Sequence, residues 1–176
     1  DKVFVSVAGT SLHKGWPLLL EAMSRLKPNQ IKKLKIIIAG NMPTEQIIED
    51  YFKKNNLENN VIFPGFVDDV RDLISIADFG FVLSTRVETI SFACREMMAM
   101  GIPVLVSDFA GLPENINHGK DGWIVKNNSV EDIQVFLAIL NSIEQKKFSD
   151  LAYKKAKNEF GIETFITKTL NIYNNL

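Results

Sequence analysis

Continuous apolar runs alternate with helical patterns along most of the chain. The runs occupy residues 3–8, 34–40, 61–65, 79–84, 103–108 and 123–125. They lack the alternation of polar and apolar residues that marks a strand with one solvated face, and such runs are typical of strands covered on both faces. The pattern therefore predicts six buried strands.

Helical patterns fill the segments between these runs. Helices are predicted at residues 17–27, 44–55, 68–77 and 91–100, with a helical turn in 111–118. Pro17 suits a first helical turn, Thr44 is an N-cap candidate, and Gly101 would end the fourth helix. From Val130 onward we expect helix in two or three pieces, broken near Ser149 and Gly161.

Buried strands that alternate with helices favour a doubly wound α/β fold. We expect a Rossmann-like parallel sheet of about six strands flanked by helices, in one domain spanning residues 1–176. Ligands of such sheets bind beyond the carboxyl ends of the strands. The loops that follow the strands are therefore where functional residues are expected.

Composition narrows the function classes. The chain has 176 residues, 46% of them hydrophobic, and a net charge of -1, which gives no electrostatic footprint for nucleic acid. We interpret the lysines between residues 27 and 35 as a solvated loop. Cys94 is the single cysteine, so an internal disulfide and a Cys/His metal site are excluded, and we expect it in the core. A reducing, cytoplasmic location is expected.

The loop after the first strand carries a candidate phosphate ligand. Gly9 would let a ligand approach the backbone, and Lys14 places a cation beyond the strand end. A loop lysine is more often only solvated, so Lys14 alone is weak evidence. The chain has no G-x-G-x-x-G motif, which counts against a dinucleotide fold of the dehydrogenase type.

The stretch after the fourth strand carries two carboxylates around a helix start. Glu88 precedes the predicted helix and Glu96 lies inside it, while free amides near Thr89 and Ser91 favour an anion. Carboxylates on both flanks of an anion site suit a ligand with hydroxyls at both ends and phosphate between, which is the layout of a nucleotide sugar. Alternatively, Glu88 is a carboxylate stabilised by the helix dipole, and Glu96 is a surface helix residue, with or without a neighbouring arginine as its partner.

This stretch resembles a known family. Glu88, seven residues, Glu96, then Gly101-x-Pro103-Val, a strand and a Gly-x-Pro-Glu turn ending at Glu114 are similar to the retaining GT-B glycosyltransferases often called family 4. The resemblance covers essentially the whole chain in order. Further matching stretches lie at residues 14–15, 36–40, 61–67, 77–78, 118–125 and 165–173.

The resemblance implies a role for each matching residue. Lys14 would hold the diphosphate, Glu88 would contact hydroxyls of the donor sugar, and Glu96 would bind the ribose hydroxyls. Two backbone stretches would complete the site. The diphosphate would be cradled by the amides of Thr89, Ile90 and Ser91, and the base would lie along Gly65, Phe66 and Val67.

The chain also departs from the family pattern. Many members carry an arginine a few residues before the lysine, but Gly9 or Thr10 occupies that place here. Arg86 is a candidate replacement, or else an exposed loop cation. Thr89 and Ser91 stand where glycines are frequent, so less room is left around the backbone.

The family also implies a reaction and partners. We expect transfer of a hexose or N-acetylhexosamine from a nucleotide sugar, by analogy a UDP sugar, with retention of anomeric configuration and no required metal or other cofactor. The acceptor would be a glycan or lipid-linked oligosaccharide in bacterial surface polysaccharide synthesis of the O-antigen type, at the cytoplasmic face of the inner membrane.

The resemblance also predicts how the chain relates to the whole enzyme. The acceptor-binding N-terminal domain has no counterpart in this chain, so little or no transfer is expected from it alone. The alternatives are a GT-B enzyme that does not transfer sugar, such as an epimerase or phosphorylase, and a non-catalytic nucleotide-binding module.

Overall fold

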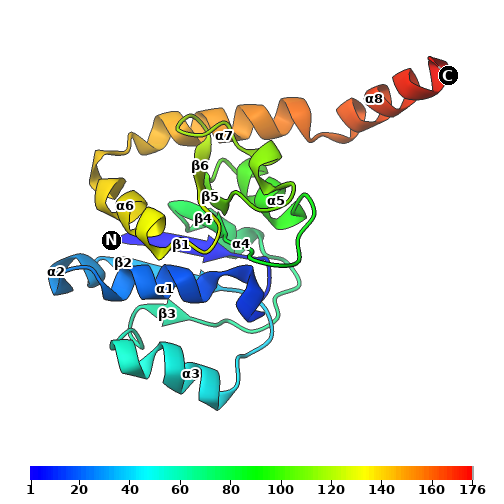
Figure 1. The fold of residues 1–176 in the computed structure, drawn as a ribbon. Coiled ribbons are helices and arrows are strands. Elements are labelled where there is room, and N and C mark those ends of the chain that lie inside the picture. The colour runs from blue at the N-terminus through cyan, green and yellow to red at the C-terminus, as the bar shows by residue number, and fades with distance from the viewer. Residues whose placement is uncertain (176) are drawn as a thin grey trace.

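A sheet of six parallel strands forms the centre of the computed structural model, which describes residues 1–175 without the side chain of Lys54. Figure 1 shows the strands with their carboxyl ends toward one edge of the sheet. The strands are β1 (Lys2–Ser6), β2 (Leu34–Ile38), β3 (Val61–Ile62), β4 (Phe79–Val82), β5 (Val104–Ser107) and β6 (Gly122–Val125).

The strand order is β3-β2-β1-β4-β5-β6, which confirms the doubly wound α/β prediction. The direction of winding reverses between β1 and β4, where Phe4 pairs with Phe79 and Val5 with Gly80. The loops after these two strands therefore leave the sheet side by side and diverge to opposite faces. In open α/β sheets this switch point is where ligands bind.

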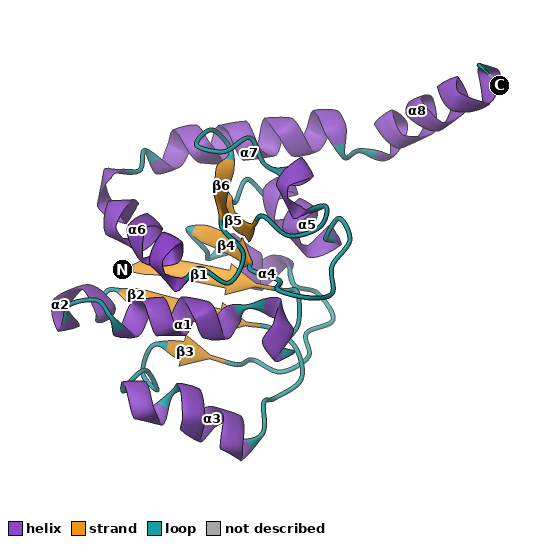
Figure 2. Cartoon of the chain, in the orientation of Figure 1, coloured by secondary structure: helices purple, strands orange, loops and turns teal. Residues whose placement is uncertain are grey.

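Helices lie on both faces of the sheet (Figure 2). The α-helices are α1 (Trp16–Ser24), α2 (Pro28–Ile31), α3 (Glu45–Tyr51), α4 (Arg71–Ser75), α5 (Phe92–Ala99), α6 (Val130–Ile139), α7 (Gln145–Glu159) and α8 (Ile162–Asn174). Short 3-10 turns are η1 (Leu12–Lys14), η2 (Lys53–Asn55), η3 (Leu112–Asn115) and η4 (Leu140–Ser142).

Side chains of neighbouring strand residues pack into two separate hydrophobic cores, one on each face of the sheet. Phe4 packs with α1 and α6 on one face, whereas Val5 packs with α4, α5 and α7 on the other. Side chains of a strand alternate between its faces, so only a continuous apolar run can fill both cores. Cys94 is completely buried in the second core, as expected, and burial raises the pKa of its thiol to about 12.

Several local signals are confirmed. Pro17 lies in the first turn of α1, the Thr44 hydroxyl caps α3 by accepting from the Ile47 amide, and α5 ends just before Gly101. The strands are shorter than predicted: β1, β2 and β4 end at residues 6, 38 and 82, where the prediction had 8, 40 and 84. The two residues beyond each of these strand ends belong to the loops at the carboxyl ends of the strands.

Two predictions about the helices are wrong. Ser149 lies inside α7, and the chain breaks earlier, at Ile143 and Glu144. Ala152 and Ala156 bury one side of α7 against the body, and this packing outweighs the modest cost of a serine in a helix. The lysine-rich segment expected as a loop contains the short helix α2, which has Pro28 in its first turn.

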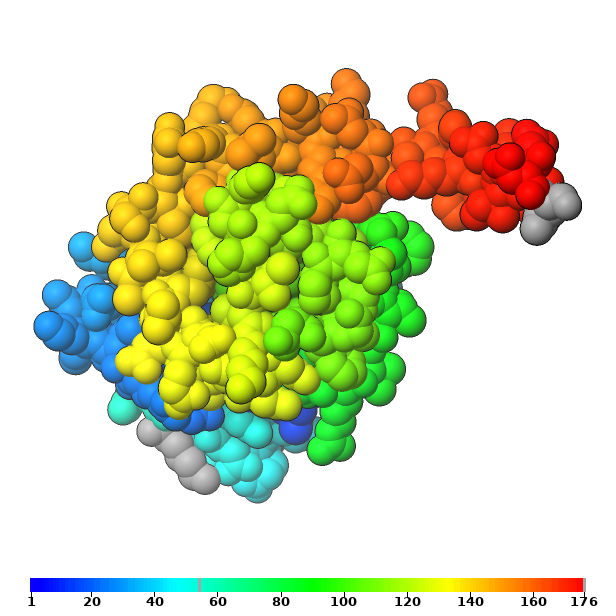
Figure 3. Space-filling view, turned by 45° about the horizontal axis from the view of Figure 1, so that its top comes forward, coloured from blue at the N-terminus to red at the C-terminus, as the bar shows by residue number. Residues whose placement is uncertain are grey.

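The last helix leaves the body at Gly161, where a break was expected. None of its described residues is buried, and Figures 1 and 3 show it protruding beyond α7. Its exposed apolar side chains include Ile162, Phe165, Leu170 and Tyr173. Within residues 1–175, no helix is both long and apolar enough to cross a membrane.

Gly15 provides a test of how tightly the loop after β1 packs. Its φ is +78°, and a Cβ atom there would lie 1.9 Å from the Leu83 carbonyl oxygen. Gly9 has a similar φ of +90° but open space around it, which makes it a matched control. We expect Gly9→Ala to cost about 1–2 kcal/mol through backbone strain alone.

For Gly15→Ala, overpacking should add about 1–3 kcal/mol to that strain. Urea denaturation of both variants measures the difference in the free energy of unfolding. Equal destabilisation would show that the loop is not pressed against β4.

Candidate functional site

The loops after β1 and β4 are joined directly at the switch point. Gly15, which follows η1, lies against the Leu83 backbone at the end of β4. The Thr85 amide donates a hydrogen bond to the His13 carbonyl oxygen, 2.8 Å away. These contacts bring side chains from two distant stretches of sequence to one place.

The two predicted catalytic residues form an ion pair where these loops meet. Lys14 Nζ lies 3.1 Å from Glu88 Oε2, with the side chains 21% and 8% exposed. The Ser84 hydroxyl donates to the same carboxylate oxygen at 2.8 Å, and the Thr89 amide donates to Oε1 at 3.1 Å. The Glu88 side chain is therefore largely covered, and its carboxylate accepts three hydrogen bonds in the loop after β4.

Burial alone would raise the pKa of the Glu88 carboxyl. The hydrogen bonds from Ser84, the Thr89 amide and Lys14, with the charge of Lys14, outweigh burial and hold that pKa below its ordinary value of 4.5. The carboxylate is therefore ionised at neutral pH and acts as a hydrogen-bond acceptor.

Backbone amides lie next to this ion pair at the start of α5. The Ser91 hydroxyl caps the helix by accepting from the Cys94 amide. Among the described residues, no acceptor binds the amides of Ile90 and Ser91, whereas the Thr89 amide is occupied by Glu88. Unpaired amides at the positive end of a helix dipole attract anions. Two of the three amides predicted to cradle a diphosphate are thus open.

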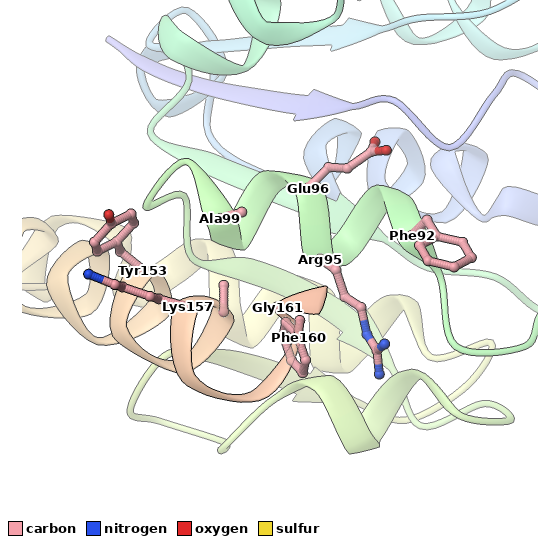
Figure 4. A pocket seen from close by; sticks show the side chains of 9 residues that line it. Phe92, Arg95, Glu96, Ala99, Tyr153, Lys157, Phe160 and Gly161 are labelled. Atoms are coloured by element: carbon pink, nitrogen blue, oxygen red, sulfur yellow. The ribbon is translucent and has the colours of Figure 1, made fainter. Parts of the chain in front are cut away.

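Glu96 lies one turn further into α5 and is exposed. Its carboxylate has no hydrogen-bond or ion-pair partner in the described part of the chain. In Figure 4 it points away from Arg95 and Phe160. Glu96 does not pair with Arg95, which lies over the Phe160 ring at 4.4 Å and donates to Asn115. The exposure of Glu96 fits both a surface residue and a ligand contact, so its role stays a prediction.

A pocket of about 370 Å³ lies among the loops after β1, β2 and β3. Four predicted donor-binding residues line it, Gly9, Thr10, Phe66 and Val67. Gly65 is adjacent, and its carbonyl oxygen accepts from the Gly40 amide at 2.9 Å. The structure therefore joins the two stretches predicted to meet the phosphate and the base.

The missing phosphate-binding arginine has no evident replacement. The Thr10 hydroxyl donates to the Asn41 carbonyl oxygen at 2.6 Å and carries no charge. Arg86 is exposed two residues before Glu88, without a hydrogen bond or ion pair to the rest of residues 1–175. Its proposed role stays a prediction. The same residues contain no group of three or more metal-ligating side chains.

Sequence reasoning missed two polar residues of the site. Ser84 is a donor to Glu88, and the signal was a serine at the end of the apolar run 79–84, four positions before the carboxylate. Asn115 is completely buried beside the start of α5, and its only signal was a polar residue following the Gly-x-Pro-Glu turn.

A larger pocket of about 490 Å³ lies on the other side of α5, between that helix and α7 (Figure 4). Phe92, Arg95 and Phe160 are among its lining residues, and Glu96 forms part of its wall. Among the six predicted residues of α5 and the loop before it, only Glu96 borders this pocket. The pocket therefore lies beside the predicted site and does not coincide with it.

Exposed apolar side chains follow four of the strands at the carboxyl edge. We call this set the apolar rim. It consists of Leu12, Met42, Phe66, Val87 and Phe92, which are 43%, 60%, 77%, 69% and 74% exposed. Large apolar side chains exposed together mark surfaces that another molecule or domain covers.

The sheet order and the loops at its switch point define the chain as a doubly wound α/β domain of the ligand-binding type. The family model described as "Glycosyl transferases group 1" matches residues 1–158. The chain therefore belongs to the glycosyl transferases group 1 family, which confirms the resemblance.

Relatives and solved structures agree with this assignment. A putative colanic acid biosynthesis glycosyltransferase, WcaL of Salmonella typhimurium, is 30% identical over 147 residues, which are 80% of this chain and 36% of that protein. The amylovoran biosynthesis glycosyltransferase AmsK of Erwinia amylovora is 30% identical over 148 residues, 80% of this chain and 35% of AmsK.

Among solved structures, Anabaena Alr3699/HepE in complex with UDP-glucose superposes with a TM-score of 0.84 at 22% identity. The match covers 100% of this chain and 49% of HepE. The similarity shows the GT-B type of fold. The chain thus spans between about a third and a half of the proteins that it matches.

Lys14→Met tests the energetic role of the ion pair. It leaves the buried Glu88 carboxylate without its cation, so we expect a loss of about 1–3 kcal/mol of stability at pH 7. The pKa of Glu88 should rise. A carboxyl whose pKa is lowered by folding stabilises the fold at pH values above its ordinary pKa of 4.5. The difference in the free energy of unfolding between variant and wild type should therefore shrink as the pH falls below 4.5.

Lys53→Met is the matched control, because Lys53 pairs with Glu49 at 2.7 Å with both side chains more than half exposed. It should change the free energy of unfolding much less than Lys14→Met does, because solvent screens an exposed ion pair. Chemical denaturation across pH, with a carbon-13 titration of the Glu88 carboxyl, measures both effects. A penalty for Lys14→Met that is the same at pH 3 and pH 7 would contradict the ion-pair explanation.

Proposed function

We propose that this chain binds the nucleotide-sugar donor of a retaining glycosyltransferase. The observation that carries the proposal is the Lys14–Glu88 pair, which lies at the switch point next to the open amides of Ile90 and Ser91. A cation, free amides and an ionised carboxylate together match a ligand with adjacent phosphates and sugar hydroxyls.

Each part of the donor has a proposed place. The diphosphate lies between Lys14 and the amides at the start of α5. The carboxylate of Glu88 accepts from hydroxyls of the donor sugar on one side, and that of Glu96 accepts from the ribose on the other. The base lies toward the pocket that Gly9 and Phe66 help to line.

The ion pair has a consequence for binding. A diphosphate that takes hydrogen bonds from Lys14 competes with Glu88 for the same ammonium. Glu88 then loses a partner and has an acceptor oxygen available for a sugar hydroxyl. Binding of the diphosphate and recognition of the sugar are coupled through this exchange.

The transfer step would use the same groups. As the bond between sugar and diphosphate breaks, negative charge grows on the leaving diphosphate. Lys14 and fixed amides facing that charge would stabilise it. The proposal requires no metal or other cofactor, so excess EDTA should leave nucleotide binding unchanged.

The donor and acceptor are proposed from the relatives. HepE was solved with UDP and with UDP-glucose, which supports a UDP-linked hexose or N-acetylhexosamine. WcaL and AmsK are named for colanic acid and amylovoran biosynthesis. A glycan or lipid-linked oligosaccharide in bacterial surface polysaccharide synthesis, of the O-antigen type, is the corresponding acceptor.

A second, acceptor-binding domain forms part of the proposal. The residues of the apolar rim are exposed in the segments that follow β1 to β4, and the apolar side chains of α8 are exposed as well. A domain facing the rim would cover these side chains and exclude water from the donor. We propose further that the enzyme is cytoplasmic and is held at the inner membrane through that domain.

Calorimetric titration with UDP, UDP-glucose and UDP-N-acetylglucosamine tests the donor assignment. Glu96→Ala should weaken binding of UDP itself by about tenfold, because a ribose contact is lost. Glu88→Gln removes a negative charge beside the diphosphate and frees Lys14. It should leave UDP affinity unchanged or higher, and abolish the additional affinity that the sugar supplies.

The contrary outcomes point to the other functions. If UDP, GDP and ADP all fail to bind, the proposal is wrong, and a non-catalytic domain that keeps only the fold is favoured. Equal losses for UDP and UDP sugars on Glu88→Gln would contradict the sugar contact.

Transfer activity is a separate test. Without an acceptor site, this chain should bind a UDP sugar and form no measurable product with a lipid-linked oligosaccharide. A radiolabelled-donor assay measures the product, and a chain extended by its N-terminal domain is the comparison. Robust transfer by the 176 residues alone would overturn the two-domain proposal.

A further inference from the structure

Asn115 is the last residue of η3 and is completely buried, yet it contacts the start of α5. Its side-chain nitrogen lies 2.6 Å from the Ile90 carbonyl oxygen and 3.2 Å from that of Leu112. Its side-chain oxygen accepts from Arg95 Nε at 2.9 Å. A buried amide with both ends satisfied has a defined orientation.

A second bond from η3 holds the neighbouring peptide. The Gly111 amide donates to the Thr89 carbonyl oxygen at 3.0 Å. The carbonyls of Thr89 and Ile90 are therefore both bound on the side of η3.

The direction of the open amides follows from peptide geometry. In a trans peptide unit the carbonyl and the N–H point in opposite directions, and the structure has no cis peptide bond among its described residues. The Thr89 carbonyl shares a unit with the Ile90 N–H, and the Ile90 carbonyl shares one with the Ser91 N–H. Both amides therefore point away from η3, and neither meets an acceptor of the described chain.

We propose that Asn115 is a positioning residue that aims the Ser91 amide, and with Gly111 the Ile90 amide, at the donor diphosphate. This inference rests on the proposed function, because it needs a diphosphate on the amide side of the loop. Asn115 does not touch the ligand. It acts by holding two dipoles in the direction where a phosphate oxygen lies.

Arg95 supports the same arrangement from the other end of the side chain. A guanidinium only donates, so the oxygen of Asn115 must face Arg95 and the nitrogen must face Ile90. The guanidinium is itself held over the Phe160 ring. Arg95 thus selects the one amide orientation that binds the Ile90 carbonyl.

Asn115→Asp tests the role with little change in volume. The carboxylate can still accept from Arg95, but it places an oxygen against the Ile90 carbonyl, and repulsion between them should turn that peptide. We expect UDP affinity to fall by about ten- to a hundredfold, the cost of lost hydrogen bonds to a charged group. Affinity for uridine, which has no phosphate, should not change.

Asn60→Asp is the matched control. Asn60 is 6% exposed, and its side-chain nitrogen also donates to two carbonyls, those of Ile31 and Leu34, each at 2.8 Å. These contacts join α2 to β2, away from the carboxyl edge. This variant should lose stability while it keeps the wild-type ratio of UDP to uridine affinity.

Arg95→Met is a milder second variant in case Asn115→Asp does not fold. It removes the bond that orients the Asn115 amide and should lower UDP affinity about threefold or more, again without an effect on uridine. In nitrogen-15 NMR spectra, the Ile90 and Ser91 amide signals should shift with UDP in the wild type and much less in both variants.

The outcomes separate the two hypotheses. Wild-type affinity for UDP in Asn115→Asp and Arg95→Met would overturn the positioning role and leave the proposed function intact. Equal losses for uridine and UDP would also overturn it, because general unfolding would explain them. A wild-type chain that binds no nucleotide would overturn the proposed function, and this inference with it.

Discussion

The close approach of the loops after β1 and β4 is the constraint on which the rest of the site depends. The loop after β1 touches the Leu83 backbone only because position 15 has no side chain. That contact brings Lys14 within 3.1 Å of Glu88, although 74 positions separate them. The winding of the sheet reverses at the same place, so the loops then diverge and leave this pair at their junction.

The ion pair at this junction balances two charges that would each be unfavourable alone. A lone buried carboxylate would be costly, and a lone lysine would attract any anion. Paired, they neutralise each other while Ser84 keeps the carboxylate in place. In the proposed complex, a diphosphate would replace the carboxylate as partner of the ammonium, and the attraction that held the pair would act on the ligand instead. Recognition of the sugar would then depend on the carboxylate oxygen that Lys14 has left.

Much of the fold could be predicted from the sequence, because apolar runs report burial directly. Phe4 and Val5 fill two different cores, and only a strand covered on both faces requires that. The positions of Lys14 and Glu88 also followed from the strand ends. The break near Ser149 was wrong because local propensity is weak against the packing of Ala152. The network of Asn115 could not be found, since its partners are carbonyls that carry no sequence signal.

The same reasoning explains how the chain tolerates Thr89 and Ser91 where its relatives often have glycine. Ser91 has a φ of +57°, a left-handed conformation that costs a residue with a side chain about 1 kcal/mol or more. Its hydroxyl regains part of that cost by capping α5, and the bond from Asn115 to the preceding carbonyl fixes the peptide on its other side. Backbone amides bind a phosphate whatever side chains they carry, provided that their direction is held. In the proposed complex, that direction would be set by Asn115, Arg95 and the Gly111 amide, so the freedom that glycine gives would not be needed.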